Sequence, residues 1–172
     1  AGARRGDPPP SGEPLPGAGR IFAQVSHLRD SERCGRTLFS LFSKAAQPEL
    51  LTVGLMEQND KDDKTCVEHF GELCVEDQDD GVYHCPYMEQ IRLVSLFATA
   101  GHGSIYARSL LRKVLGDEEF CLQLDSHSDV IPGWDDVLLT QWTTVGNENA
   151  ILSADPPPAG DLLDANATRA PA

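Results

Sequence analysis

The sequence predicts an α/β protein with an open, mostly parallel sheet. Short apolar runs alternate along the chain with segments whose apolar residues recur at helical spacing. Continuous apolar runs are typical of parallel strands, because helices cover both faces of such sheets. Right-handed crossovers would bring the carboxyl ends of several strands to one edge, where sheets of this class bind their ligands.

Five strands are expected in this sheet. Most of them are continuous apolar runs. Pro48 indicates a break in secondary structure just before the second strand. The last is only the beginning of a strand. The expected ranges are residues 20–26 (RIFAQVS), 50–56 (LLTVGLM), 91–97 (IRLVSLF), 120–124 (FCLQL) and 150–153 (AILS).

Three helices are expected between these strands. Ser31 suits the N-cap position of the first helix, whose apolar residues recur at helical spacing until it ends near Ala46. The second helix, over residues 105–115, is amphipathic, and Gly116 closes it. The third covers residues 134–142.

The two ends of the chain are expected to be disordered, with one domain between them over residues 20–154. Residues 1–19 are rich in Pro, Gly and Arg without periodicity, and the tail over residues 155–172 is rich in Pro and small residues. The 172-residue chain has 27 acidic and 14 basic side chains, and its net charge of -13 disfavours nucleic acid and anionic membranes as partners. No apolar run approaches the length of a membrane span.

The five cysteines fall into two groups. Cys121 lies inside an apolar strand and Cys34 lies near a helix start, so both are expected to be plain thiols. The other three lie in residues 58–88, which are predicted to form a long acidic loop. They can contain a disulfide in an oxidising compartment, stay as thiols, or bind zinc with a nearby histidine, and the lack of a Cys-x-x-Cys pair disfavours zinc. These cysteines are Cys66, Cys74 and Cys85, and the histidines are His69 and His84.

Polar residues follow the first two strands at their carboxyl ends. Ser26, Arg29 and Asp30 leave the first strand, and Glu57 leaves the second. In sheets of this class such residues face the nucleotide, and a guanidinium and a carboxylate could contact its base or ribose. The simpler alternative for Asp30 is that it caps the following helix.

Asp125-Ser126-His127 follows the fourth expected strand. Asp125 and His127 are expected to point the same way, with Ser126 facing the other side, because side chains in extended backbone alternate. A carboxylate oxygen and a neutral imidazole nitrogen suit a divalent ion such as Mn²⁺, which can itself hold a diphosphate. The triplet therefore indicates a nucleotide-sugar site, although a helix cap and a turn would use the same residue types.

A glycine-containing turn, Gly101-His102-Gly103, precedes the second expected helix. It approaches the dinucleotide fingerprint, but Tyr106 stands where that fingerprint has a small residue. A nicotinamide site is therefore disfavoured. Arg108 on the same helix is either a solvated charge or a guanidinium that binds a diphosphate bidentately.

Five blocks of sequence occur in a characteristic order. They are IFAQVSHLRD, PELLTVGLMEQND, CPYMEQIRLVSL, GSIYARSLLRKVLGDEEFCLQLDSHSDVIPGWDDVL and NAILS. In this order they resemble the N-terminal part of the N-acetylglucosaminyltransferase-like glycosyltransferase family, whose members include protein transferases that modify hydroxyproline. The fourth block is also similar to mucin-type N-acetylgalactosaminyltransferases, in which an R-A-R helix precedes an L-D-S-H metal motif.

The resemblance implies a GT-A fold that transfers N-acetylglucosamine from a UDP-sugar to a protein hydroxyl with the help of a divalent cation, Mn²⁺. By position, Asp125 and His127 would hold the metal, and Arg108 would approach the diphosphate or the sugar. The residues implied at the uridine and ribose are Ser26, Arg29, Asp30, Glu57 and Asp125.

Catalytic domains of this family extend well beyond the D-x-H block, and the later half supplies the acceptor groove and usually a third metal ligand. This chain continues instead with DPPPAGDLLDANATRAPA. The alternative is therefore a truncated and catalytically inactive relative that acts as a binding or interaction domain. The cytoplasm and the Golgi lumen both stay open as its compartment.

Overall fold

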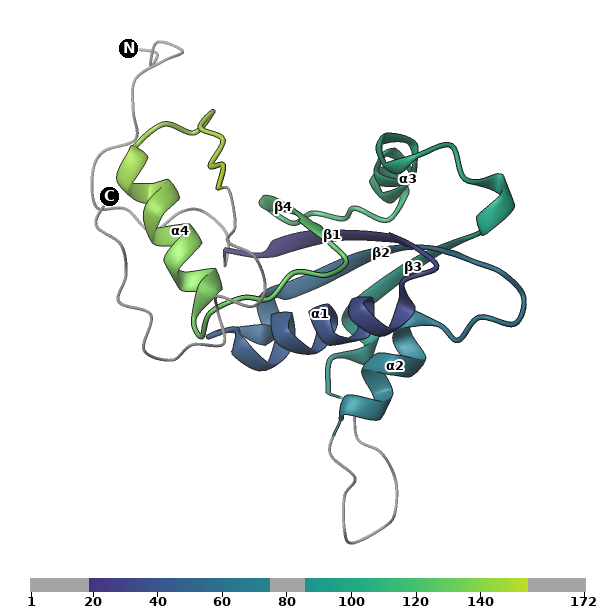
Figure 1. The fold of residues 1–172 in the computed structure, drawn as a ribbon. Coiled ribbons are helices and arrows are strands. Elements are labelled where there is room, and N and C mark those ends of the chain that lie inside the picture. The colour runs from purple at the N-terminus through teal and green to yellow at the C-terminus, as the bar shows by residue number, and fades with distance from the viewer. Residues whose placement is uncertain (1–18, 75–85, 155–172) are drawn as a thin grey trace, which may run out of the picture.

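Four parallel strands form one open sheet in the computed structural model, which describes residues 19–74 and 86–154 (Figure 1). The order of the strands across the sheet is β3-β2-β1-β4, and every neighbouring pair is parallel. The predicted α/β class with an open parallel sheet is confirmed. The strands are β1 (Ile21–Leu28), β2 (Leu51–Asn59), β3 (Ile91–Phe97) and β4 (Phe120–Asp125).

Helices cover both faces of this sheet. α1 and α2 pack together on one face, and α3 lies on the other (Figure 1). The α-helices of the described residues are α1 (Ser31–Lys44), α2 (Cys66–Leu73), α3 (Ser104–Leu110) and α4 (Trp134–Val145). Short 3-10 turns occupy Pro48–Leu50, Met88–Gln90, Ala98–Ala100 and Leu111–Lys113.

The main hydrophobic core lies between the sheet and helix α1. Val25 of β1 and Leu55 of β2 are fully buried in it together with Leu38 of α1. Because side chains alternate along a strand, the next residue of β2, Met56, faces away from this core. Met56 packs instead against Ala107 of α3 in a smaller core on the opposite face. Alternate residues of a strand therefore pack against the helices on opposite faces of the sheet.

Helix α2 lies inside the loop that was predicted over residues 58–88, so that prediction is wrong for this part. Thr65 and Glu68 form a capping box at its start. The Thr65 hydroxyl oxygen accepts from the Glu68 N–H at 3.1 Å, and the Glu68 carboxylate accepts from the Thr65 N–H at 2.7 Å. The T-x-x-E spacing is a recognised helix-start pattern. Residues 75–85 of the predicted loop lie outside the described residues.

Three smaller expectations also differ from the structure. Residues 150–153 form no strand. The helix predicted over residues 105–115 is shorter, because α3 passes into a 3-10 turn at Leu111. Asp30, and not Ser31, occupies the N-cap position of α1, and the Ser31 hydroxyl donates to Asn59 Oδ1 at 3.3 Å.

The cysteines also depart from expectation. Cys34, predicted to be a plain thiol, forms a disulfide with Cys66 that joins α1 to α2 across 32 positions of sequence. Cys74 is disulfide-bonded as well. Cys121 is a free thiol, as predicted, and Cys85 lies outside the described residues.

The expectations for the two ends of the chain concern residues that the structure does not describe, apart from Gly19. No helix in the described part is long and apolar enough to cross a membrane.

Candidate functional site

Three of the predicted site residues meet on the α3 face of the sheet, at the carboxyl ends of β1 and β4. Ser26 is the register partner of Asp125, so both side chains leave the sheet on the same face. Arg108 reaches this position from α3, and its Nη2 donates to Asp125 Oδ1 at 2.5 Å. The structure therefore brings Ser26, Arg108 and Asp125 together from three separate segments.

Arg108 keeps an unused donor at this site. Its Nε is buried and has no hydrogen-bond partner among the described residues. Leaving a buried donor unpaired costs about 1–3 kcal/mol, and more when the group is charged. The helix that carries it is held to the sheet by Ala107, which is fully buried next to Met56. The guanidinium thus has one arm on Asp125 and spare capacity for a further acceptor.

The triplet Asp125-Ser126-His127 shows the predicted alternation in its exposure. Asp125 and His127 are exposed, whereas Ser126 between them is buried. The backbone of the triplet is anchored to α1, because the Thr37 hydroxyl donates to the Ser126 carbonyl at 2.9 Å. In the described part of the chain, no third His, Cys, Asp or Glu joins Asp125 and His127 in a cluster that could hold a metal ion. Two ligand-type side chains therefore stand on an anchored turn and reach solvent.

Asp30 lies beside this triplet but is not a helix cap through its side chain. Its carboxylate makes no capping hydrogen bond to α1. It accepts instead from the Ser126 hydroxyl at 3.3 Å and from Arg33 Nε at 2.7 Å. Asp30 therefore occupies the N-cap position, as its alternative interpretation expected, but without a side-chain cap, and its carboxylate is hydrogen-bonded to the Asp125-Ser126-His127 turn.

The Arg29 side chain forms ion pairs with the loop that follows β2. Its guanidinium pairs with Asp60 at 2.7 Å and with Asp63 at 2.8 Å. The hydrogen bond from Arg29 holds the pKa of Asp63 below its usual range, and the same bond raises the pKa of Arg29. The residue has a φ of 51°, and its N–H donates to the Gln58 carbonyl at 2.9 Å. These contacts fasten the ends of β1 and β2 to each other.

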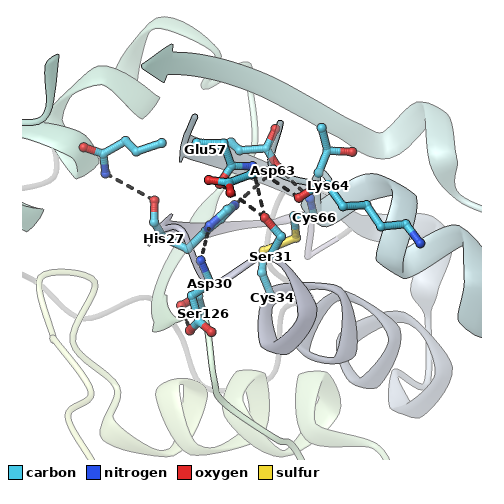
Figure 2. A network of polar contacts seen from close by, with 12 residues as sticks. His27, Asp30, Ser31, Cys34, Glu57, Asp63, Lys64, Cys66 and Ser126 are labelled. Carbon is cyan, nitrogen blue, oxygen red and sulfur yellow. Dashed lines mark hydrogen bonds and ion pairs between the residues drawn. A yellow bond between two sulfur atoms is a disulfide. The ribbon is translucent and has the colours of Figure 1, made fainter. Parts of the chain in front are cut away.

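Glu57 does not join the other predicted site residues. It is the register partner of His27, and both side chains point into the buried space beneath α1 and α2 (Figure 2). Its Oε1 lies 3.3 Å from His27 Nε2 and accepts from the Cys66 N–H at 2.6 Å. Ser26 and Asp125 face the opposite side of the sheet. The role of Glu57 at a ribose stays a prediction that these contacts do not favour.

The sequence analysis did not single out His27, which the structure places in buried contact with Glu57. The sequence does indicate that His27 is buried, because it lies two and four residues after the core residues Val25 and Ala23 of β1 and so points to the same face of the sheet. An imidazole at a core position needs polar partners, and Glu57 occupies the same parity on the next strand. The alternation of side chains along the two strands therefore places His27 and Glu57 on one face of the sheet and Ser26 on the other.

The family model described as Glycosyltransferase (GlcNAc) matches residues 20–160, which include every strand and helix described above. Comparison with curated proteins and with solved structures finds no significant match. The family match covers most of the chain and includes the segments that carry Ser26, Arg108 and Asp125. The chain therefore belongs to the Glycosyltransferase (GlcNAc) family.

Proposed function

We propose that this chain binds the UDP-sugar donor of a reaction that transfers N-acetylglucosamine to a protein hydroxyl. Membership of the glycosyltransferase family supports transferase chemistry with a sugar donor and an acceptor. The observation that carries the proposal is the Arg108–Asp125 pair at the carboxyl edge of the sheet, with Arg108 Nε left without a partner. The resemblance in sequence points to hydroxyproline as the acceptor residue and to a GT-A fold.

The donor diphosphate is assigned to Arg108. A guanidinium presents a rigid fork of N–H donors that matches phosphate oxygens. With Nη2 on Asp125, the buried Nε of Arg108 would gain its missing acceptor from a phosphate oxygen. A diphosphate at this position would thereby relieve the cost of the unpaired donor.

Asp125 and His127 are proposed to hold a divalent cation, Mn²⁺. The residues fit such an ion because both side chains are exposed on one anchored turn and offer an oxygen and a nitrogen ligand. Only Oδ1 of Asp125 is bonded to Arg108, so its second oxygen is open to an ion. When bound, the cation would neutralise the negative charge that develops on the leaving nucleotide diphosphate.

The uridine contacts are proposed for Ser26 and Asp30. Ser26 is partly exposed on the site's face of the sheet, and Asp30 is hydrogen-bonded to the metal triplet. Arg29 and Glu57 were predicted at the same pocket, but ion pairs or buried hydrogen bonds already engage their side chains. We assign them to shaping the strand ends around the pocket.

Titration calorimetry with UDP-N-acetylglucosamine tests this function. Binding is expected to need Mn²⁺ and to be lost in a chelator. In Asp125→Asn the metal-dependent part of the affinity should fall about tenfold or more, because a neutral amide holds a cation poorly. Asp62→Asn is the matched control, since Asp62 is an exposed acid in the loop after β2. Equal affinity in Asp125→Asn and the wild type would contradict the metal site.

A second pair of variants isolates the diphosphate contact. Arg108→Lys keeps the positive charge but removes the Nε donor and the fork, so UDP itself should bind about tenfold more weakly. Arg112→Lys is the control on the same segment, because Arg112 is exposed. Titration with UDP-N-acetylgalactosamine in place of UDP-N-acetylglucosamine then distinguishes the two donor sugars.

A non-catalytic interaction domain is the second candidate function. Exposed apolar side chains on edge strand β3 favour it, because Leu93 is 46% and Phe97 is 67% exposed. This function predicts metal-independent binding of a partner protein and no binding of UDP, so the same calorimetry separates the two candidates.

A further inference from the structure

Helix α1 carries a stripe of polar side chains beside its buried apolar face. Thr37, Ser40 and Lys44 are three and four positions apart, so they lie in one row along the helix. All three side chains bond to residues 126–130, the segment that follows β4. This segment contains His127, a proposed metal ligand. The stripe therefore connects α1 to the proposed donor site.

Thr37 holds the backbone carbonyls of the two residues that flank His127. Its hydroxyl oxygen lies 2.9 Å from the Ser126 carbonyl oxygen and 2.9 Å from the Ser128 carbonyl oxygen. A hydroxyl has one hydrogen to donate, so the two carbonyls share it. Thr37 is 1% exposed, and solvent water therefore does not compete for these contacts. Because a side chain branched at Cβ has few rotamers in a helix, α1 fixes the position of this hydroxyl.

The direction of the His127 side chain depends on this backbone. Within residues 19–74 and 86–154 the imidazole makes no hydrogen bond, ion pair or ring contact, and it is exposed. The turn that carries His127 therefore sets where the ring points. Asp125, in contrast, belongs to β4 and is held by its register with Ser26 of β1. The sheet thus fixes one proposed ligand, and Thr37 of α1 fixes the other.

We infer that Thr37 is a positioning residue for the proposed Mn²⁺ site. It fixes the backbone of His127 and so keeps the imidazole in a set position relative to the Asp125 carboxylate. A metal ion binds more tightly to ligands that are already in place, because ordering a loose side chain costs conformational entropy. This inference rests on the proposed function, since it concerns the metal ligands assigned there.

Thr37→Val tests this role, because valine has almost the shape of threonine but no hydroxyl. Mn²⁺ affinity in the presence of UDP, measured from the electron paramagnetic resonance signal of the free ion, should fall about tenfold or more, as it does when a residue that orients a metal ligand is lost. Thr37→Ser keeps the hydroxyl and should recover most of the affinity. Ser40→Ala is the matched control, since it removes the neighbouring contacts of the same stripe, to Asp129 and Val130, and should leave the affinity unchanged.

The magnetic coupling between the ion and a ring nitrogen gives a readout that a loss of stability alone would not change. Pulsed electron paramagnetic resonance of the wild type with Mn²⁺ and UDP should show an imidazole nitrogen coupled to the ion, and His127→Ala should lose it. Thr37→Val should weaken this coupling strongly. Ser40→Ala should keep it, and so should His102→Ala, which removes another exposed histidine. Full coupling in Thr37→Val would overturn the inference.

A measurement without metal keeps the test decisive if Thr37→Val fails to fold. Nuclear magnetic resonance order parameters of the amides of residues 126–128 should be about 0.85 in the wild type, as in rigid backbone, and should drop below about 0.6 in Thr37→Val. Values below about 0.6 in the wild type itself would overturn the inference, because the turn would then not be fixed.

The outcomes also separate this inference from the proposed function. A wild type that binds no Mn²⁺ in the presence of UDP would overturn the proposed metal site and the role of Thr37 together. A wild type that binds the ion, beside a Thr37→Val variant of equal affinity, would overturn the role of Thr37 alone.

Discussion

At the scale of single residues, Asp129 holds the chain after the Asp125-Ser126-His127 turn against helix α1. Its carboxylate accepts from Lys44 Nζ at 2.5 Å, from the Ser40 hydroxyl, and from the Val130 N–H at 2.9 Å. Burial raises the pKa of Asp129, but the hydrogen bonds from Lys44 and Ser40 outweigh it, so the pKa lies below its usual range. The charged form of Asp129 therefore stabilises the fold next to the proposed site.

Asp129→Asn is expected to lower the free energy of unfolding by about 1 kcal/mol at pH 7, since the ion pair is partly exposed. The sign follows from the lowered pKa of the folded state. The stabilisation is present above the unfolded pKa of about 3.9 and is lost as the pH falls through the folded pKa. Urea unfolding at pH 7, 5 and 3 measures this change.

Asp136→Asn serves as the comparison for Asp129, because Asp136 is exposed on α4 and its carboxylate accepts a single long hydrogen bond within the described part of the chain, from Gln47 Nε2 at 3.2 Å. Its effect should be a few tenths of a kcal/mol at most. A deficit in Asp129→Asn that is as large at pH 3 as at pH 7 would show that the lost charge is not the cause.

At the scale of secondary structure, helix α2 depends on its first turn. It has only eight residues, which is too short for a stable isolated helix. The Thr65–Glu68 capping box and the Glu57 contact to the Cys66 N–H satisfy three of the N–H groups at this end. The hydrogen bond from the Thr65 N–H also lowers the pKa of Glu68. These bonds explain how a short helix persists inside a polar segment.

Thr65→Ala removes the side-chain acceptor of this box and should cost about 1 kcal/mol of unfolding free energy. Thr65→Ser should recover most of the loss, because serine caps as well as threonine. Urea unfolding measures both. Thr144→Ala on the exposed face of α4 is the reference change, and an equal loss there would mean that capping is not responsible.

At the scale of the whole molecule, one covalent link joins the α1 and α2 layer. The Cys34–Cys66 disulfide closes a loop with a sequence separation of 32, which contains all of β2. A cross-link of this span removes conformational freedom mainly from the unfolded chain. It also ties α1 and α2 together on the side of the sheet away from the proposed donor site.

The double variant Cys34→Ala/Cys66→Ala should unfold with about 3–4 kcal/mol less free energy than the oxidised wild type, as expected for a loop of this length. Urea unfolding of the two proteins measures the difference. Cys121→Ala, which removes the free thiol, should change stability far less. A loss below about 1 kcal/mol in the double variant would show that packing alone joins the helices.

Much of the architecture could be predicted from local pattern. Apolar runs located all four strands of the described sheet to within a few residues, and the third was predicted with its full range, Ile91–Phe97. Asp125 was correctly expected at the end of a strand, with the exposure of its neighbours alternating as in extended backbone. Helix α2 was missed because its short apolar face lies in a polar segment, although its T-x-x-E start is visible in the sequence.

The sequence by itself determined the fold class and the position of the Asp125-Ser126-His127 turn, because both follow from the period of apolar residues and from strand ends. Tertiary structure alone decided that Arg108 pairs with Asp125, that Glu57 turns to His27, and that Cys34 bonds to Cys66. These contacts join residues 17 to 32 positions apart, and they depend on strand register and on the face that each helix crosses. Local sequence specifies neither, because both arise only when the layers pack.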